Sequence, residues 1–162
     1  MNTLKPELQA TIDQRFLDIA QSLANSCQAL ERTHAMQLNA VGRGIPGVYV
    51  LSESDKHLYA GRGKDVATRL DLHRWGNSDQ ASFAFKLARE ATGKLKPTYK
   101  KEGSRKDLMN DPHFVAAFKA AKQRISNMEV RVVLEEDAVR QALLEIYVAV
   151  VLQTPYNDFN TT

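Results

Sequence analysis

Apolar residues recur at steps of three and four along the first part of the chain. They are Leu8, Ile12, Phe16, Ile19, Leu23, Cys27 and Leu30. This spacing predicts an amphipathic helix from Lys5 to about His34. The pattern fits a helix that packs on its own domain as well as one that packs against another subunit. Gly42, Gly44 and Pro46 then interrupt the periodicity, so we expect a connector after the helix.

Two short runs rich in β-branched and aromatic residues come next. Gly47–Ser52 and His57–Gly61 flank the turn-like pair Ser54–Asp55, an arrangement that predicts a β-hairpin. The run Met128–Leu134 alternates between apolar and polar residues and predicts a third strand. Three short strands do not suit a doubly wound sheet, so a small central sheet covered by helices is expected.

Four more helices are predicted from capping residues and apolar stripes. They run from Asp65 to His73 or Arg74, from Ser78 or Asp79 to the residue before Gly93, from Asp111 to about Ile125, and from Glu136 to Leu152. The segment Gly93–Asp107 is polar and basic and contains Pro97 and Gly103, so a loop is expected there. The predicted fold class is therefore α+β, with an extra N-terminal amphipathic helix.

Length and composition favour one compact unit that lies in a reducing compartment. Residues 1–46 would form the N-terminal helix and connector, and residues 47–162 the main domain. The single cysteine, Cys27, rules out a disulfide framework and a multi-cysteine zinc site. The most apolar segment, Leu143–Leu152, is too short to cross a bilayer, and charged residues interrupt any early apolar run. We expect a cytoplasmic protein with no membrane contact.

Positive charge is concentrated in the middle of the chain, although the net charge is only +3. Between Lys56 and Lys106 there are thirteen lysine and arginine residues but only five aspartate and glutamate residues. One basic face on a nearly neutral protein indicates a phosphate-rich partner. The alternative is a solvated surface that serves only solubility.

Several residues in this basic region carry groups suited to phosphate chemistry. Arg69 and His73 are four apart, so a helix would present them on one face. A guanidinium group binds a phosphate through two hydrogen bonds, and a histidine accepts or relays a proton. Tyr49 and Tyr59 lie on the two hairpin strands, where packing is the alternative role. Gly61 ends the second strand, at either a turn or a close approach to a ligand.

Two further candidates lie near the C-terminus. Glu145 is surrounded by apolar residues, and a carboxylate is costly to bury unless it is paired or bound to a metal. It could instead face water on an exposed side of the helix. Mg²⁺ commonly takes one or two protein oxygens together with water and substrate phosphate. Asn157 follows this helix, at a place where asparagine is usually a turn residue.

Taken together, these positions resemble the GIY-YIG nuclease family. Gly47-Val48-Tyr49 is similar to the first signature and Tyr59-Ala60-Gly61 to the second, at the separation that a hairpin requires. Both tripeptides have lost the usual isoleucine, and Gly63 stands where serine or threonine is common. These replacements keep small or apolar side chains, so they do not affect the proposed chemistry.

Four later positions extend the resemblance to residues 47–157. Arg69 follows the second signature, and His73 follows Arg69, both at the family's offsets. Glu145 matches the metal-binding glutamate of the family, and Asn157 matches the asparagine after it. The resemblance implies a three-stranded, mainly antiparallel sheet flanked by helices. It also implies a metal-dependent endonuclease that hydrolyses DNA phosphodiester bonds.

The resemblance also assigns a role to each site residue. Tyr49, or water held by it, would be the general base, and His73 would accept the relayed proton. Tyr59 would orient the scissile phosphate, and Arg69 would neutralise charge on the phosphorane. Glu145 would hold Mg²⁺ or Mn²⁺, and Asn157 would brace the site. Residues expected to contact nucleic acid are Gly61, Arg62, Lys64, Arg74, Lys94, Lys96, Lys100, Lys101, Arg105 and Lys106.

The expected partner is DNA, either double-stranded or branched, and the N-terminal helix could form a homodimer. The alternative function is a non-catalytic nucleic-acid-binding module on the same scaffold. A degenerate copy of the family should have lost Arg69 or Glu145, and both are present. A third possibility is an interaction protein whose first helix and basic loop bind a partner.

Overall fold

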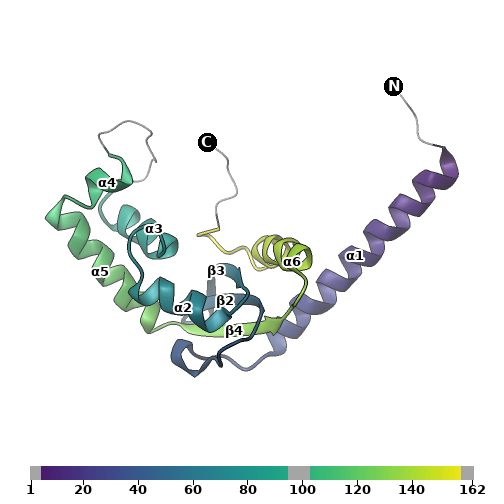
Figure 1. Ribbon diagram of the computed structural model, residues 1–162, viewed down its shortest axis with the longest axis horizontal. Coiled ribbons are helices and arrows are strands. Elements are labelled where there is room, and N and C mark those ends of the chain that lie inside the picture. The colour runs from purple at the N-terminus through teal and green to yellow at the C-terminus, as the bar shows by residue number, and fades with distance from the viewer. Residues whose placement is uncertain (1–4, 95–102, 158–162) are drawn as a thin grey trace.

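The computed structural model describes residues 5–94 and 103–157. The elements in this part of the chain, shown in Figure 1, are α1 (Pro6–Arg32), β1 (Met36–Gln37), the 3₁₀ helix η1 (Leu38–Ala40), β2 (Gly47–Glu53), β3 (Lys56–Gly63), α2 (Val66–Trp75), α3 (Ser82–Ala91), α4 (Arg105–Leu108), α5 (Pro112–Ser126), β4 (Glu129–Leu134) and α6 (Ala138–Val151). The fold is mixed α+β, as the order of predicted elements indicated.

The sheet has four strands in the order β1-β4-β2-β3, and every neighbouring pair is antiparallel. The expectation of three strands was therefore wrong. The additional strand is β1, in which Met36 pairs with Val130 of β4. Two residues are too few to show a strand periodicity, and β1 lies directly before the predicted connector. Strand β2 is central and β3 lies at an edge.

Helices cover both faces of the sheet (Figure 1). Because side chains alternate along a strand, β2 contributes to two cores. Tyr49 and Leu51 belong to the core that includes residues of α2, α3 and α5, whereas Val48 and Val50 belong to the core that includes residues of α1 and α6. Helices α2 and α6, one from each layer, both contact β3, the edge strand. This edge therefore brings together side chains from α2 and from α6.

Two of the predicted helix starts are confirmed by their capping bonds. The Asp65 carboxylate accepts a hydrogen bond from the backbone N–H of Thr68, and α2 follows. Asp111 accepts from the backbone N–H of His113 at the start of α5. Both caps satisfy amide groups that have no partner within the helix. They fix where α2 and α5 begin.

Helix α3 starts later than the sequence indicated, at Ser82 rather than Ser78 or Asp79. The side-chain oxygen of Asn77 accepts hydrogen bonds from the backbone N–H groups of Asp79 and Gln80. Asparagine side chains compete with the helix for backbone groups in this way. The residues before Ser82 therefore form turns.

Helix α1 has one half on the body and one half beyond it (Figure 1). Leu23, Cys27 and Leu30 are buried in the core that includes Leu144 and Val148 of α6. The first half of α1 extends away from the rest of the chain. Among the residues that the structure describes, no helix combines the length and the apolar character needed to cross a membrane.

Candidate active site

Tyr49 and His73 form a buried polar pair between β2 and α2. Tyr49 Oη lies 2.7 Å from His73 Nε2, and neither residue is exposed to solvent. Tyr49 points toward α2 because odd-numbered residues of this part of β2 face that layer. His73 lies about one helical turn after the buried Leu70. The distance allows a proton to pass between the phenol and the imidazole.

Burial keeps both groups of this pair neutral at pH 7. Burial first, and then the nearby Tyr59, raise the pKa of the Tyr49 phenol well above its usual value, while Arg69 opposes the rise. Burial and the positive charge of Arg69 lower the pKa of His73 to about 3. Within the described part of the chain, His73 Nδ1 has no hydrogen-bond partner. The imidazole is therefore held by one bond, to the oxygen of Tyr49.

Gly61 makes room for the phenol of Tyr49. The two residues are partners in the β2–β3 register. A Cβ added to Gly61 would lie 2.4 Å from Tyr49 Oη, well inside van der Waals contact. The sequence indicated that Gly61 ends the strand at a turn or at a close approach to a ligand, but β3 continues to Gly63 and the close neighbour is Tyr49. A contact between Gly61 and DNA stays a prediction.

Tyr59 is held by other aromatic rings. It stacks on Phe83 with 4.7 Å between ring centroids, and its ring meets that of His73 edge-on at 5.3 Å. Phe83 also contacts the ring of Tyr156 at 5.2 Å. Sequence reasoning missed Phe83 and Tyr156 as supports of the site. Phe83 belongs to an apolar helix stripe that looks like ordinary core, and Tyr156 is marked only by its place beside Asn157.

Arg69 supplies positive charge to this cluster. Its Nη1 donates a hydrogen bond of 3.0 Å to the carbonyl oxygen of Gln80, in the turn before α3. The guanidinium lowers the pKa of Tyr59 and of Glu145, in each case against the larger effect of burial. Arg69 is thus close enough to act on both Tyr59 and Glu145. Its positive charge would stabilise an anion placed between them.

Glu145 reaches the same edge from α6 and pairs with Arg62. Arg62 Nε donates a 3.0 Å hydrogen bond to Glu145 Oε2, and the Glu145 side chain is 23% exposed. Arg62 faces α6 because it alternates with Gly61 along β3. Burial raises the pKa of Glu145, while Arg62 and then Arg69 lower it. The sequence placed Arg62 among the DNA contacts and gave no signal for this ion pair.

At this edge the described residues offer one carboxylate, that of Glu145, and not a complete cage for a divalent ion. Among the described residues, there is no group of three or more His, Cys, Asp or Glu side chains that could hold a metal. Glu145 offers one partly buried carboxylate that already attracts a cation, the guanidinium of Arg62. Mg²⁺ and Mn²⁺ are often bound through one or two carboxylates, with water and phosphate oxygens completing the shell.

Asn157 binds the free edge of β3. Its side-chain oxygen accepts a 2.7 Å hydrogen bond from the backbone N–H of Ala60, and its Nδ2 donates a 2.8 Å bond to the Ala60 carbonyl. Thr154 Oγ1 donates to the same side-chain oxygen. A side-chain amide therefore replaces a neighbouring strand beside Tyr59 and Gly61, a geometry suited to a brace.

The basic residues are spread over three places. Lys64 is exposed just after β3, near the cluster in sequence. The Arg74 guanidinium is held outside the cluster contacts, since it pairs with Asp71 at 3.4 Å and lies over the ring of Trp75 at 5.1 Å. The structure therefore does not group Arg74 with Tyr49. Lys96, Lys100 and Lys101 lie outside the described residues.

The third place surrounds α4, a short helix where the sequence predicted only a loop. Arg105 lies 3.6 Å from the Asp79 carboxylate, and its guanidinium lies over the Phe85 ring at 4.2 Å. Lys94 and Lys106 are exposed. In this they resemble Lys64, which is also exposed.

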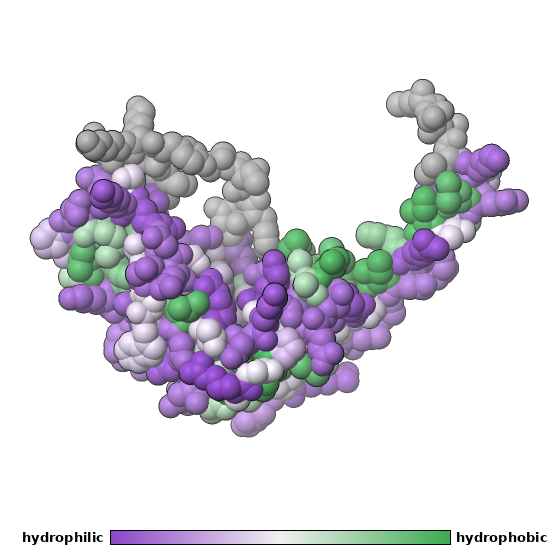
Figure 2. All heavy atoms as spheres, in the orientation of Figure 1, coloured by the Kyte–Doolittle hydropathy of each residue, from purple (hydrophilic) through white to green (hydrophobic). Residues whose placement is uncertain are grey.

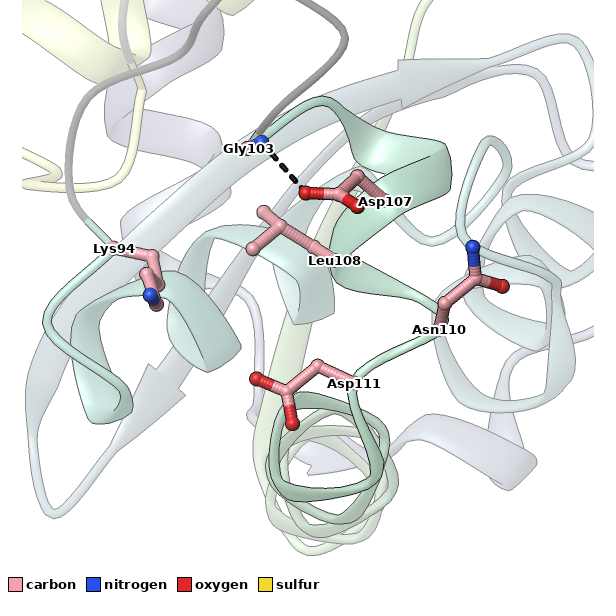
Figure 3. Close-up of a pocket in the computed structure, with 6 residues that line it drawn as sticks. All are labelled: Lys94, Gly103, Asp107, Leu108, Asn110 and Asp111. Atoms are coloured by element: carbon pink, nitrogen blue, oxygen red, sulfur yellow. Dashed lines mark hydrogen bonds between the residues drawn. The ribbon is translucent and has the colours of Figure 1, made fainter.

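A pocket of about 480 Å³ lies between Lys94 and the start of α5 (Figure 3). Two carboxylates, those of Asp107 and Asp111, share its lining with Lys94. Asp107 accepts a 2.7 Å hydrogen bond from the backbone N–H of Gly103. None of the six candidate catalytic residues lines it. This pocket has mixed charge and is not the place where phosphate chemistry would concentrate.

The predicted catalytic residues thus come together at one edge of the sheet, from β2, β3, α2, α6 and the segment after α6. The arrangement provides a phenol–imidazole pair, a second phenol, two guanidinium groups and one carboxylate. The chain matches no protein-family model, no curated protein and no solved structure.

Proposed function

We propose that this chain is a metal-dependent endonuclease that hydrolyses DNA phosphodiester bonds, with the reaction type of the GIY-YIG nucleases that it resembles. The observation that supports the proposal best is the buried 2.7 Å contact between Tyr49 Oη and His73 Nε2. Within the described residues, His73 Nδ1 is buried without a hydrogen-bond partner, which is costly, and apolar residues would pack this part of the core without that cost. The pair is therefore better explained by chemistry than by stability.

Tyr49 would act as a proton relay. A free phenol has a pKa near about 10, and burial raises the pKa of Tyr49 further. A lasting phenolate is therefore costly. Instead, the Tyr49 oxygen would take a proton from the attacking water while its own proton moves to His73 Nε2. The negative charge of a bound phosphate would favour the resulting imidazolium, which burial and the charge of Arg69 disfavour.

The phosphate would be bound by Tyr59 and Arg69. The Tyr59 ring is fixed by its stack on Phe83, so its hydroxyl has a defined direction. Arg69 is held by the Gln80 carbonyl and would face the charge that develops on phosphorus. A guanidinium placed before the reaction begins stabilises such charge without reorganisation.

Glu145 would hold Mg²⁺ or Mn²⁺, which when bound stabilises charge on the leaving oxygen. Arg62 now occupies one oxygen of this carboxylate. Arg62 would then leave Glu145 and contact the DNA backbone, in agreement with its place among the predicted DNA contacts. Asn157 would keep the edge of β3, and with it Tyr59, in position.

The Arg62–Glu145 ion pair also favours the second candidate function, a nucleic-acid-binding module without catalysis. The pair neutralises the carboxylate on which metal binding would depend. The arginines and the basic segment would then bind phosphates and leave them intact. The two functions differ in whether DNA that is bound is also cut.

The test compares wild type with Glu145→Gln and Arg69→Ala on plasmid, branched and single-stranded DNA in Mg²⁺ or Mn²⁺. We expect each substitution to slow cleavage by about 100- to 1,000-fold, because each removes charge stabilisation at the reacting phosphate. Glu129→Gln, at an exposed position of β4, is the matched control and should cut like wild type.

Three outcomes decide between the functions. Cleavage that depends on Glu145 and Arg69 supports the nuclease. DNA binding by the wild type without any cleavage supports the binding module. Equal cleavage by all variants would place the reaction elsewhere and overturn the assignment of these residues.

A further inference from the structure

The apolar stripe of α1 is covered over only half of its length. Leu23, Cys27 and Leu30 are buried against the body. Four residues with the same spacing continue the stripe toward the N-terminus and remain exposed: Leu8, Ile12, Phe16 and Ile19. Because their spacing is that of the buried half, they lie on the same side of the helix.

Helix α6 has a second uncovered stripe. Its inner side buries Leu144 and Val148 against the sheet and α1. Four exposed residues at steps of four and three lie on the opposite side of the helix: Val139, Leu143, Ile146 and Val150. This outer side is separate from Glu145, which pairs with Arg62 at the edge of β3.

The two stripes border the same hollow. Figure 2 shows hydrophobic atoms on α6 and along the side of α1 that faces it. The inner half of α1 is fixed beside α6 by packing and by a 2.8 Å hydrogen bond from Arg140 Nη2 to Ser22 Oγ. The outer half of α1 therefore extends past α6 at a defined angle. Together, the two stripes form one bent apolar surface, which we call the α1–α6 surface.

We propose that the α1–α6 surface binds a second copy of this chain. In this dimer the outer half of each α1 packs on the outer stripe of the partner's α6, so that each protomer both gives and receives a helix. A two-fold axis requires such a self-complementary surface. The surface meets this requirement because each copy carries both an uncovered α1 stripe and an uncovered α6 stripe.

The exposed area agrees with a stable dimer. The eight exposed residues of the two stripes are each between 39% and 69% exposed. They leave on the order of 800 Å² uncovered per copy, which is about the area that each partner buries in a standard interface. Isolated surface leucines are common, but a continuous apolar patch of this size is unusual on a monomer. The inference does not depend on DNA cleavage.

The test measures molecular mass by light scattering and sedimentation over a range of protein concentrations. Wild type should have twice the 18.2 kDa mass of one chain. Phe16→Glu and Ile146→Glu should each weaken the dimer at least 30-fold, since each places a charge in the centre of the contact. Leu17→Glu is the matched control. Leu17 is 59% exposed but lies on another side of α1, so its variant should stay dimeric.

A mixing experiment tests the reciprocal arrangement. Phe16→Lys and Ile146→Glu chains should each be monomeric alone. When mixed, they should form a dimer that has one native contact and one contact with opposite charges. The dimer is not expected to re-form on mixing if α1 pairs only with α1 of the partner.

Three results would overturn the proposal. A wild type that stays monomeric at about 100 µM contradicts it, because an interface of this size should associate well below that concentration. A dimer that tolerates Phe16→Glu uses another surface. A mixture that stays monomeric contradicts the α1–α6 contact. Far-UV circular dichroism of every variant shows whether the chains are folded.

Discussion

The candidate active site and the basic residues around α4 differ in how their side chains are held. Tyr49 and His73 are buried and bonded to each other, and Tyr59 is fixed by stacking. Lys94 and Lys106, by contrast, are exposed. The difference indicates a division of labour. The edge of β3 would set the geometry of the reaction, while the surface near α4 would contribute charge that attracts DNA.

Removing the Tyr49 hydroxyl should have the largest effect on cleavage. Tyr49→Phe keeps the ring in the core and abolishes the proton relay to His73, so we expect cleavage of bound DNA to slow by about 100- to 10,000-fold. Tyr147→Phe on α6 removes a half-buried hydroxyl outside the cluster and is the matched control. The single-turnover rate at saturating protein separates this effect from binding. Equal rates for the two variants would remove Tyr49 from the mechanism.

Crowding the same hydroxyl should have the next largest effect. A Cβ at Gly61 would lie 2.4 Å from Tyr49 Oη, so Gly61→Ala must displace the phenol. We expect cleavage to slow by about 100-fold, as misplacement of a reacting group by 1 Å does. Gly42→Ala is the control, because its Cβ would lie 3.4 Å from Ile45 Cδ1, an ordinary contact. The single-turnover rate at saturating protein separates this effect from any change in DNA affinity, and equal rates for the two variants would contradict the role of Gly61 in placing the phenol.

His73 should make the stability of the fold depend on pH. Its pKa is about 3 in the folded protein and near the ordinary 6.5 in the unfolded chain. Between these values the unfolded chain binds more protons. Its contribution to stability is therefore complete above pH 6.5 and is lost as the pH falls, by up to about 1.4 kcal/mol per pH unit.

The free energy of urea unfolding between pH 5 and 7 measures this contribution. His73→Gln removes the titration and should give a shallower fall in stability below pH 6.5 than wild type. A variant with the wild-type slope would show that burial does not hold His73 neutral.

The basic residues should have the smallest effect, and only on binding. Lys94→Ala and Lys106→Ala should each lower the slope of log affinity against log salt by about one unit, since each removes one phosphate contact. The single-turnover rate at saturation should be unchanged. Lys5→Ala, at an exposed position before α1, is the control. An unchanged slope in both lysine variants would remove this surface from the DNA interface.

Local signals in the sequence were enough to predict most helices and the hairpin. Asp65 and Asp111 are strong capping residues, and both cap as expected. The hairpin turn at Ser54 and Asp55 has the positive φ angles that tight turns favour. In contrast, β1 has two residues and α4 has four, and such short elements depend on tertiary contacts more than on their own pattern.

The members of the candidate site could be predicted from their spacing, but their contacts could not. Arg69 and His73 are linked by helix geometry alone, so their proximity was foreseeable. The pairing of Arg62 with Glu145 joins residues 83 positions apart and depends on how α6 crosses the sheet. The stack of Phe83 on Tyr59 likewise needs the packing of α3. Long-range contacts of this kind leave no periodic signal in the chain.

Cleavage of DNA that is already bound is the most direct test of the proposed function. Wild-type protein, in slight excess, is mixed with labelled plasmid or branched DNA. Mg²⁺ or Mn²⁺ is then added to start one turnover. We expect cut product to form from the bound DNA in the presence of the ion and to be absent with a chelator. Complete binding with no product in either ion would contradict a nuclease and leave the chain as a nucleic-acid-binding module.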